Sequence, residues 1–138
     1  MTVQTQSNAA HRLLLDTHAF YWWLTGNTAL SVTARAAIAD RQNEKYVSAV
    51  TAWEFITKFR SGREPGFIRI AADVSGAVAA QGMTELPLTM RHSETASNLP
   101  PHHKDPMDRF LIGQALVADM TIVTIDTIFA TYGVKVLW

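Results

Sequence analysis

Four carboxylates stand beside apolar segments of this sequence, where an acid is costly unless it has a partner. They are Asp16, Glu54, Asp108 and Asp126. Burial of an ionised carboxylate is unfavourable unless the group is paired, protonated or bound to a cation. Several acidic oxygens together are the ligands that hard divalent cations prefer. The leading interpretation is therefore a convergent acidic cluster that holds such a cation.

Two of the four acids directly follow strand-like segments. Asp16 closes the apolar run 13–15, and Asp126 follows 121–125. In open α/β sheets, ligands bind outside the carboxyl ends of parallel strands, so both acids lie where a site is expected. Each also has a simpler explanation, because Asp16 can cap the next helix and Asp126 can be a turn residue. For Asp16, capping and metal binding are compatible, since each needs one oxygen.

Glu54 lies at the border of the apolar face of a predicted helix. Its simpler explanation is an ion pair with Lys58, four residues later, in the orientation that stabilises helices. Such a pair contributes only about 0.3–0.5 kcal/mol. The neighbouring Trp53 and Ile56 are apolar, so Glu54 is equally well placed to reach a crevice. Spacing alone leaves both explanations open.

Asp105 and Asp108 stand at the start of another predicted helix. Asp105 precedes Pro106, which is typical of an N-cap followed by the first helical residue. Asp108 then lies in the first turn, where an acid also suits the helix dipole. Because Asp108 shares a helical face with Leu111, we expect it to point toward the sheet edge and to bind metal. Asp105 is expected to be the cap or an outer group.

The adjacent His102 and His103 lie in a loop flanked by prolines. Neighbouring histidines rarely point the same way, and no third nitrogen ligand stands at a zinc-like spacing. We expect a structural or substrate-facing role for this pair and not metal binding.

The composition is that of one ordered domain. The chain has 138 residues, of which 48% are hydrophobic and 17% are charged, so it can bury a sizeable core. It has no cysteine, which excludes disulfides and thiolate ligands. No apolar run approaches the ~20 residues of a membrane helix, and the polar residues 1–10 lack the apolar segment of a signal peptide. We therefore expect no membrane segment and a cytoplasmic protein.

The charges balance, with 12 Lys and Arg residues against 12 Asp and Glu residues. Nucleic-acid binders usually have a basic excess, and this chain would have one if a cation neutralised its clustered acids. Lys58, Arg60 and Arg63 gather in segment 58–69, which has one acid. We interpret this segment either as a solvated helix end or as a patch that contacts phosphates.

Short apolar segments alternate with segments of helical spacing. Strands are expected at 12–16, 45–48, 84–88, 121–125 and 134–137. Helices are expected at 19–24, 32–41, from about 49 to Gly62, 67–81, 90–98 and 106–118. This alternation predicts an α/β fold with a parallel sheet that is covered on both faces.

Four sequence blocks occur in a distinctive order. They are Leu14-Leu15-Asp16-Thr17-His18-Ala19, Ser48-Ala49-Val50-Thr51-Ala52-Trp53-Glu54, His102-His103-Lys104-Asp105-Pro106-Met107-Asp108-Arg109-Phe110-Leu111-Ile112, and Val123-Thr124-Ile125-Asp126 with Phe129 and Tyr132. Together they resemble the PIN-domain family and, within it, the VapC-type toxins of bacterial type II toxin–antitoxin modules. The resemblance spans roughly residues 12–138.

The resemblance implies a three-layer α/β/α sandwich with a mainly parallel central sheet, and a Mg²⁺- or Mn²⁺-dependent endoribonuclease. The family's acidic positions fall on Asp16, Glu54, Asp108 and, more loosely, Asp126. It also implies a homodimer or a toxin–antitoxin hetero-oligomer, neutralised by a VapB-like antitoxin. Residues 12–138 would form the nuclease domain, and residues 1–11 a flexible tail.

Further roles follow from this assignment. Thr17, Ser48 and Thr124, together with Asp105, are expected to surround and orient the metal-binding acids. The residues expected to contact the RNA backbone are Lys58, Arg60, Arg63 and Arg109.

Other functions share parts of this pattern. An apolar strand ending in Asp-Thr is also found in haloacid-dehalogenase-type phosphatases, but these need a second Asp where this chain has His18. A non-catalytic binding module would have lost acids that are all present here. A PIN-like nuclease acting in RNA processing stays open.

Overall fold

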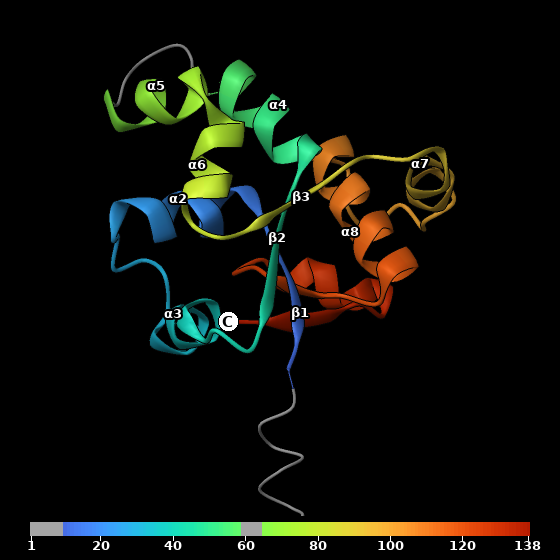
Figure 1. Ribbon diagram of the computed structural model, residues 1–138. Coiled ribbons are helices and arrows are strands. Elements are labelled where there is room, and N and C mark those ends of the chain that lie inside the picture. Colours follow the sequence, from blue (N-terminus) through green and yellow to red (C-terminus); the bar gives the residue numbers. More distant parts are fainter. Residues whose placement is uncertain (1–9, 59–64) are drawn as a thin grey trace, which may run out of the picture.

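Five parallel strands form the centre of the computed structural model, which describes residues 10–58 and 65–138 (Figure 1). The sheet has the order β3-β2-β1-β4-β5, and each neighbouring pair is parallel. The strands are β1 (Arg12–Leu15), β2 (Glu44–Ser48), β3 (Thr84–Leu86), β4 (Thr121–Val123) and β5 (Lys135–Leu137). The predicted strand positions and the parallel sheet are confirmed.

Helices cover both faces of this sheet. They are α2 (Thr17–Thr25), α3 (Val32–Ala39), α4 (Ala49–Lys58), α5 (Pro65–Ala72), α6 (Val74–Ala80), α7 (Met90–Ser97), α8 (Pro106–Ala118) and the 3₁₀ helix η1 (Thr127–Tyr132). In Figure 1, α2, α3 and α6 lie on one side of the strands, and α7 and α8 lie on the other. The α/β/α sandwich is therefore confirmed. Within the described residues, no helix is long and apolar enough to cross a membrane.

The central strand β1 is buried on both faces. Leu13 and Leu15 point into one core with Phe20 of α2 and Phe55 of α4, whereas Leu14 points into a second core beneath α8. Side chains alternate between the two faces of a strand. A strand that is buried on both sides therefore reads as a continuous apolar run, which explains the sequence 13–15.

Because the strands are parallel, their carboxyl ends meet at one edge of the sheet. β1 passes directly into Asp16, whose backbone N–H donates to the Val123 carbonyl oxygen (3.1 Å) and so extends the pairing with β4. β2 passes directly into α4, which carries Glu54. Asp126 follows shortly after β4. The topology itself thus brings these acids to a common edge.

The prediction of a single helix over 67–81 is wrong, because α5 and α6 are separate helices. Asp73 lies between them with φ −156° and ψ 77°, which is not a helical conformation. Its Oδ1 accepts a hydrogen bond from the backbone N–H of Gly76 (2.9 Å), so Asp73 is the N-cap of α6. The alanine-rich stripe concealed this cap. The 3₁₀ helix η1 was not predicted, and the expected helix end at Gly62 lies outside the described residues.

The fully buried Gln114 joins three elements of the sheet edge. Its Oε1 accepts a hydrogen bond from the Ser48 hydroxyl (2.6 Å), and its Nε2 donates to the carbonyl oxygens of Leu86 (3.4 Å) and Pro87 (3.2 Å). The network therefore ties α8 to the ends of β2 and β3, and a buried polar group satisfied in this way fixes one arrangement.

Helix α8 lies very close to α7 at Gly113. A Cβ added at Gly113 would lie 2.7 Å from the carbonyl oxygen of His92 and 3.0 Å from the backbone nitrogen of Ala96. Both are backbone atoms, so the two helices would have to move apart to admit a side chain. The glycine therefore sets the position of α8, which carries Asp108.

We expect Gly113→Ala to lower the free energy of unfolding by about 1–3 kcal/mol, although alanine is the better helix former. Val117→Ala, at an exposed position of α8, is the control and should change stability by less than about 1 kcal/mol. Urea unfolding of the two variants makes the comparison. A Gly113→Ala protein as stable as the wild type would contradict the close contact.

Candidate acidic site at the carboxyl edge of the sheet

The four predicted acids come from four different places in the chain and lie in one region. Asp16 follows β1, Glu54 lies in α4, Asp108 lies in the first turn of α8 and Asp126 follows β4. Asp108 interacts electrostatically with both Asp16 and Glu54, and Asp16 interacts with Glu54. Asp126 is joined to Asp108 through His103. These acids therefore form one interacting group at the carboxyl edge of the sheet.

Asp16 is a buried helix cap. Its Oδ1 accepts a hydrogen bond from the backbone N–H of Ala19 (2.8 Å) at the start of α2. Burial raises the pKa of Asp16 above its ordinary value, and the nearby charge of Glu54 adds to this rise. Hydrogen bonds from the Thr124 hydroxyl and the Ala19 N–H, together with the electrostatic interaction with His18, oppose the rise without cancelling it. The carboxylate of Asp16 is thus short of positive charge.

Glu54 is also buried, with 5% of its surface exposed. The Thr17 hydroxyl donates to its Oε1 (2.6 Å), and the hydroxyl of Thr51 lies 3.1 Å from that of Thr17. Because Thr17 has one hydroxyl proton and gives it to Glu54, Thr51 must donate to Thr17. Two threonines thus form a hydrogen-bonded chain that fixes the orientation of the Glu54 carboxylate.

Asp108 is half-buried at the centre of the acidic group. Burial raises the pKa of Asp108 to about 7, and the charges of Asp105, Glu54 and Asp16 contribute to the rise, whereas His103 opposes it. A carboxyl group with this pKa is partly protonated at neutral pH. The position of Asp108 beside the other acids is therefore favourable only when a proton or a cation neutralises its charge.

The imidazole of His103 lies between two of the acids. Its Nε2 is 3.0 Å from Asp108 Oδ2 and 3.2 Å from Asp126 Oδ2. The ligand atoms of these three residues lie within 4.8 Å of one another, and within residues 10–58 and 65–138 no trio that includes Asp16 or Glu54 reaches this spacing. We expected only a structural or substrate-facing role for His103. The sequence signal for its contact with the acids was its position two residues before the cap Asp105.

Asp105 and Asp126 both cap helices. Asp105 Oδ1 accepts from the backbone N–H of Met107 (2.9 Å), and Asp126 Oδ1 accepts from that of Ile128 (3.0 Å). The expected cap at Asp105 is therefore present. Each of these carboxylates has one oxygen engaged by its helix, and Asp126 Oδ2 is the oxygen that lies beside His103.

The three hydroxyl residues expected to orient the acids differ in their contacts. Thr17 donates to Glu54, and Thr124 bonds to Asp16 while its Oγ1 accepts from the Asp126 N–H (3.0 Å). Ser48 instead donates to Gln114 and accepts from the Val50 N–H (3.0 Å). Both of these hydrogen bonds stabilise the strand end, and neither of them involves an acid.

Arg109, a predicted RNA contact, is extensively bonded within the protein itself. Its guanidinium donates to four backbone carbonyl oxygens, those of Ala96 (2.9 Å), Leu99 (2.7 Å), Pro100 (2.8 Å) and His103 (3.3 Å). These bonds hold the loop that presents His103, so Arg109 positions the site from behind. Arg60 and Arg63 lie outside the described residues, as does the side chain of Lys58.

The donor set suits a hard divalent cation. The acids provide carboxylate oxygens from several elements, and their burial makes the ionised forms unfavourable unless a positive charge lies beside them. Mg²⁺ and Mn²⁺ prefer such oxygen ligands, whereas structural zinc prefers sulfur and imidazole nitrogen. The residues present therefore fit a cation of the first kind.

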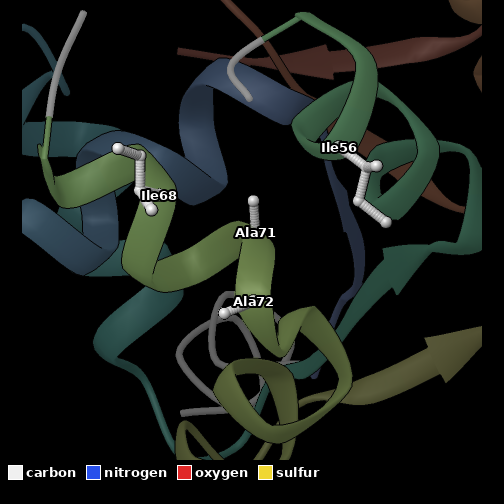
Figure 2. Close-up of a pocket in the computed structure, with 4 residues that line it drawn as sticks. All are labelled: Ile56, Ile68, Ala71 and Ala72. Carbon is white, nitrogen blue, oxygen red and sulfur yellow. The ribbon is translucent and has the colours of Figure 1, made fainter. Parts of the chain in front are cut away.

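A separate apolar hollow of about 380 Å³ lies between α4 and α5. Figure 2 shows its lining, which is Ile56 from α4 and Ile68, Ala71 and Ala72 from α5. None of these side chains can act as an acid, a base or a metal ligand.

A parallel sheet with carboxylates gathered at its carboxyl edge defines an α/β/α domain with an acidic site. The sequence pattern of the PIN domain matches residues 13–135. The match covers nearly the whole chain, and the chain therefore belongs to the PIN-domain family.

Solved structures share this fold. A chain in the structure of VapBC2 from Rickettsia felis, bound to a promoter DNA fragment, has a TM-score of 0.66 at 10% identity. The match covers 91% of the present chain and 97% of the R. felis chain. A chain of VapBC-5 from Mycobacterium tuberculosis has a TM-score of 0.62 at 17% identity, covering 94% and 98%. A chain of FitAcB from Neisseria gonorrhoeae has a TM-score of 0.61 at 17% identity, covering 91% and 96%. Among curated proteins, the sequence has no match.

We expect Asp108→Asn to change how the stability of the metal-free protein depends on pH. The ordinary pKa of Asp108 is 3.8, so the unfolded state has released this proton above about pH 4. The folded state retains the proton up to about pH 7. The proton's contribution to stability is complete below about pH 4 and is lost as pH rises through about 7. Asparagine removes this dependence, so the variant should be more stable than the wild type at pH 8, by about 1 kcal/mol or more. Chemical unfolding with a chelator at pH 5 and pH 8 measures this, and parallel pH profiles would refute it.

We expect Arg109→Lys to lower the free energy of unfolding by about 2 kcal/mol or more, because an ammonium group cannot reach four carbonyl oxygens at once. The substitution keeps the positive charge, so a residue that only attracted RNA would tolerate it. Lys104→Arg, at an exposed neighbouring position, is the matched control. Thermal unfolding of both variants decides between the two roles, and an Arg109→Lys protein with wild-type stability would exclude the positioning role.

Proposed function

We propose that this chain is a divalent-metal-dependent endoribonuclease and the toxin component of a type II toxin–antitoxin module. The observation that carries the nuclease is the electrostatically coupled group of Asp16, Glu54 and Asp108, which come from three elements far apart in sequence. Membership of the PIN-domain family, which implies nuclease activity in general, supports the same conclusion.

Mg²⁺ or Mn²⁺ is the proposed cofactor, held by Asp16, Glu54 and Asp108, with Asp126 bound directly or through water. When bound, such a cation activates a water molecule for attack and neutralises charge that develops on the phosphate. The remaining work falls to the chain. Thr17 holds the carboxylate of Glu54, and Thr124 holds that of Asp16. Oriented ligands of this kind do not have to reorganise during the reaction.

The burial of Asp16 and Glu54 contributes to this function directly. Both are less than 10% exposed, so bulk water cannot solvate their charge. The electrostatic attraction between these carboxylates and a cation is correspondingly stronger than it would be at an exposed site. In the absence of a cation, the same group repels the RNA backbone. Substrate binding is therefore expected to depend on the metal.

The RNA backbone would reach the site across its exposed rim. Lys104 is exposed and lies between His103 and Asp105, which makes it a candidate for contact with phosphate. Lys58, Arg60 and Arg63 remain predicted contacts. The choice of RNA depends on surface shape and on unpaired bases, since RNA duplexes hide their sequence from side chains.

The proposed protein partner is a VapB-like antitoxin, and a homodimer or a toxin–antitoxin hetero-oligomer is the proposed assembly. The related M. tuberculosis structure is described as a member of the VapBC family of toxin–antitoxin systems. On α4 and α5 this chain exposes Ile56 (41%) and Ile68 (50%), which line the hollow in Figure 2, and α4 also exposes Trp53 (55%). Exposed apolar groups that lie together are typical of a contact surface.

We expect Asp16→Asn to abolish metal-dependent RNA cleavage, with a loss of more than roughly 100-fold. Asparagine is a good N-cap and can still accept the bond from Ala19, so the fold should persist. Asp119→Asn is the control. It removes an equal charge from a side chain that is 86% exposed and lies at the opposite end of α8 from Asp108. Cleavage of RNA is measured with Mn²⁺ and with chelator. Undiminished cleavage by Asp16→Asn would exclude the metal assignment.

A second prediction concerns the toxin. Expression of the wild-type chain should arrest the growth of a bacterial host, whereas Asp16→Asn should not and Asp119→Asn should. Growth curves after induction, with equal protein levels checked by immunoblot, provide the measurement. RNA cleavage in vitro without growth arrest would leave the nuclease in place but contradict the toxin.

A further inference from the structure

Contacts from several segments hold both the backbone and the ring of His103 in place. The Tyr132 hydroxyl accepts a hydrogen bond from the His103 backbone N–H (2.6 Å) and donates to the Pro100 carbonyl oxygen (2.9 Å). Arg109 donates to the His103 carbonyl oxygen (3.3 Å). The ring packs edge-on against Phe129, with centroids 5.7 Å apart. The backbone of His103 is therefore fixed, and its side chain is directed at the acids.

The hydrogen bonds of the ring identify which nitrogen carries the proton. The backbone N–H of Asp105 donates to His103 Nδ1 (3.2 Å), so Nδ1 has a lone pair and no proton. In the neutral ring, the proton is then on Nε2. Nε2 faces Asp108 Oδ2 at 3.0 Å and Asp126 Oδ2 at 3.2 Å. The ring therefore presents a protonated nitrogen, and not a lone pair, on this side: Nε2–H donates to Asp126 Oδ2 and is in close contact with Asp108 Oδ2.

A ring in this tautomer cannot bind a cation through Nε2. A nitrogen that binds a metal must be unprotonated. If Nε2 were the ligand, the ring proton would be on Nδ1, where it would repel the Asp105 N–H that now donates to this atom. A cation that approached Asp108 Oδ2 and Asp126 Oδ2 together would also meet the protonated Nε2, since Nε2 lies 3.0 Å and 3.2 Å from these oxygens. Asp126 has little alternative, because its Oδ1 already caps Ile128.

We propose that His103 is a positioning residue whose Nε2–H holds Asp108 and Asp126 together without metal, and which a cation bridging these two carboxylates must displace. This proposal rests on the proposed function, because it concerns the same metal site. The side chain of His103 can rotate about its own bonds while Tyr132 and Arg109 retain its backbone. Loading of the site then exchanges the Nε2–H hydrogen-bond donor for a cation, so that the two carboxylates have a partner in both states.

Calorimetric titration with Mn²⁺ of the wild type, His103→Ala and His103→Gln tests this competition. His103→Ala removes the donor, so it should bind Mn²⁺ roughly ten-fold more tightly, the equivalent of one hydrogen bond to a charged group. Glutamine can place an amide N–H near the position of Nε2, so His103→Gln should bind as the wild type does. Weaker binding by His103→Ala would make His103 a ligand, and equal binding by all three proteins would show that it does not compete. Either result overturns the proposal and leaves the nuclease intact.

A spectroscopic measurement tests the donor assignment without reference to binding or activity. Side-chain ¹⁵N shifts of the metal-free wild type should show a protonated Nε2 and an unprotonated Nδ1 for His103. Addition of Mg²⁺ should move the Nε2 resonance as its contacts with the carboxylates are lost. A metal-free ring protonated on Nδ1 would overturn the proposal. A wild type that binds neither ion would overturn the proposed function as well, which distinguishes the two failures.

Discussion

The structure depends on the electrostatic cost of bringing buried carboxylates together. Asp16 and Glu54 are almost fully buried, and each raises the energy of the other's charge. Asp108 lies within reach of both, and its pKa of about 7 reflects burial together with the same repulsion. A fold that only had to be stable would separate these groups or replace them with apolar side chains. Their convergence is therefore the feature that the rest of the molecule has to support.

The support comes from ordinary elements of secondary structure. Asp16, Asp105 and Asp126 each cap a helix, so one oxygen of each carboxylate bonds to backbone N–H groups. The threonines beside Glu54 and Asp16 supply hydroxyl donors. Behind them, Gln114 fixes the ends of two strands and Arg109 fixes the loop before α8. Local stability and the placement of the acids are thus achieved by the same hydrogen bonds.

Much of this architecture could be predicted from the sequence, because the relevant signals are local. The apolar run 13–15 followed by Asp16 predicts a buried strand and a cap, and Asp105-Pro106 predicts the start of α8. The division of 67–81 was missed because Asp73 stands within an alanine-rich stripe that continues the helical period. The bonds of Arg109 to backbone carbonyl oxygens and of Ser48 to Gln114 were not predicted, because no motif specifies these partners. The contacts of His103 join three segments and depend on tertiary structure alone.

Because the strands run in a common direction, the two ends of the molecule differ in how well they tolerate an insertion or an attached group. An added residue between β1 and Asp16 would break the hydrogen bond to Val123 and carry the acid out of its place. By contrast, the turn that ends α2 at Gly26, in the left-handed conformation with φ 66°, leads through exposed residues 25–29 to α3. That turn belongs to the connection between helices and contributes nothing to the acidic group. It is the natural position for a fluorophore or a surface anchor in single-molecule work on the intact protein.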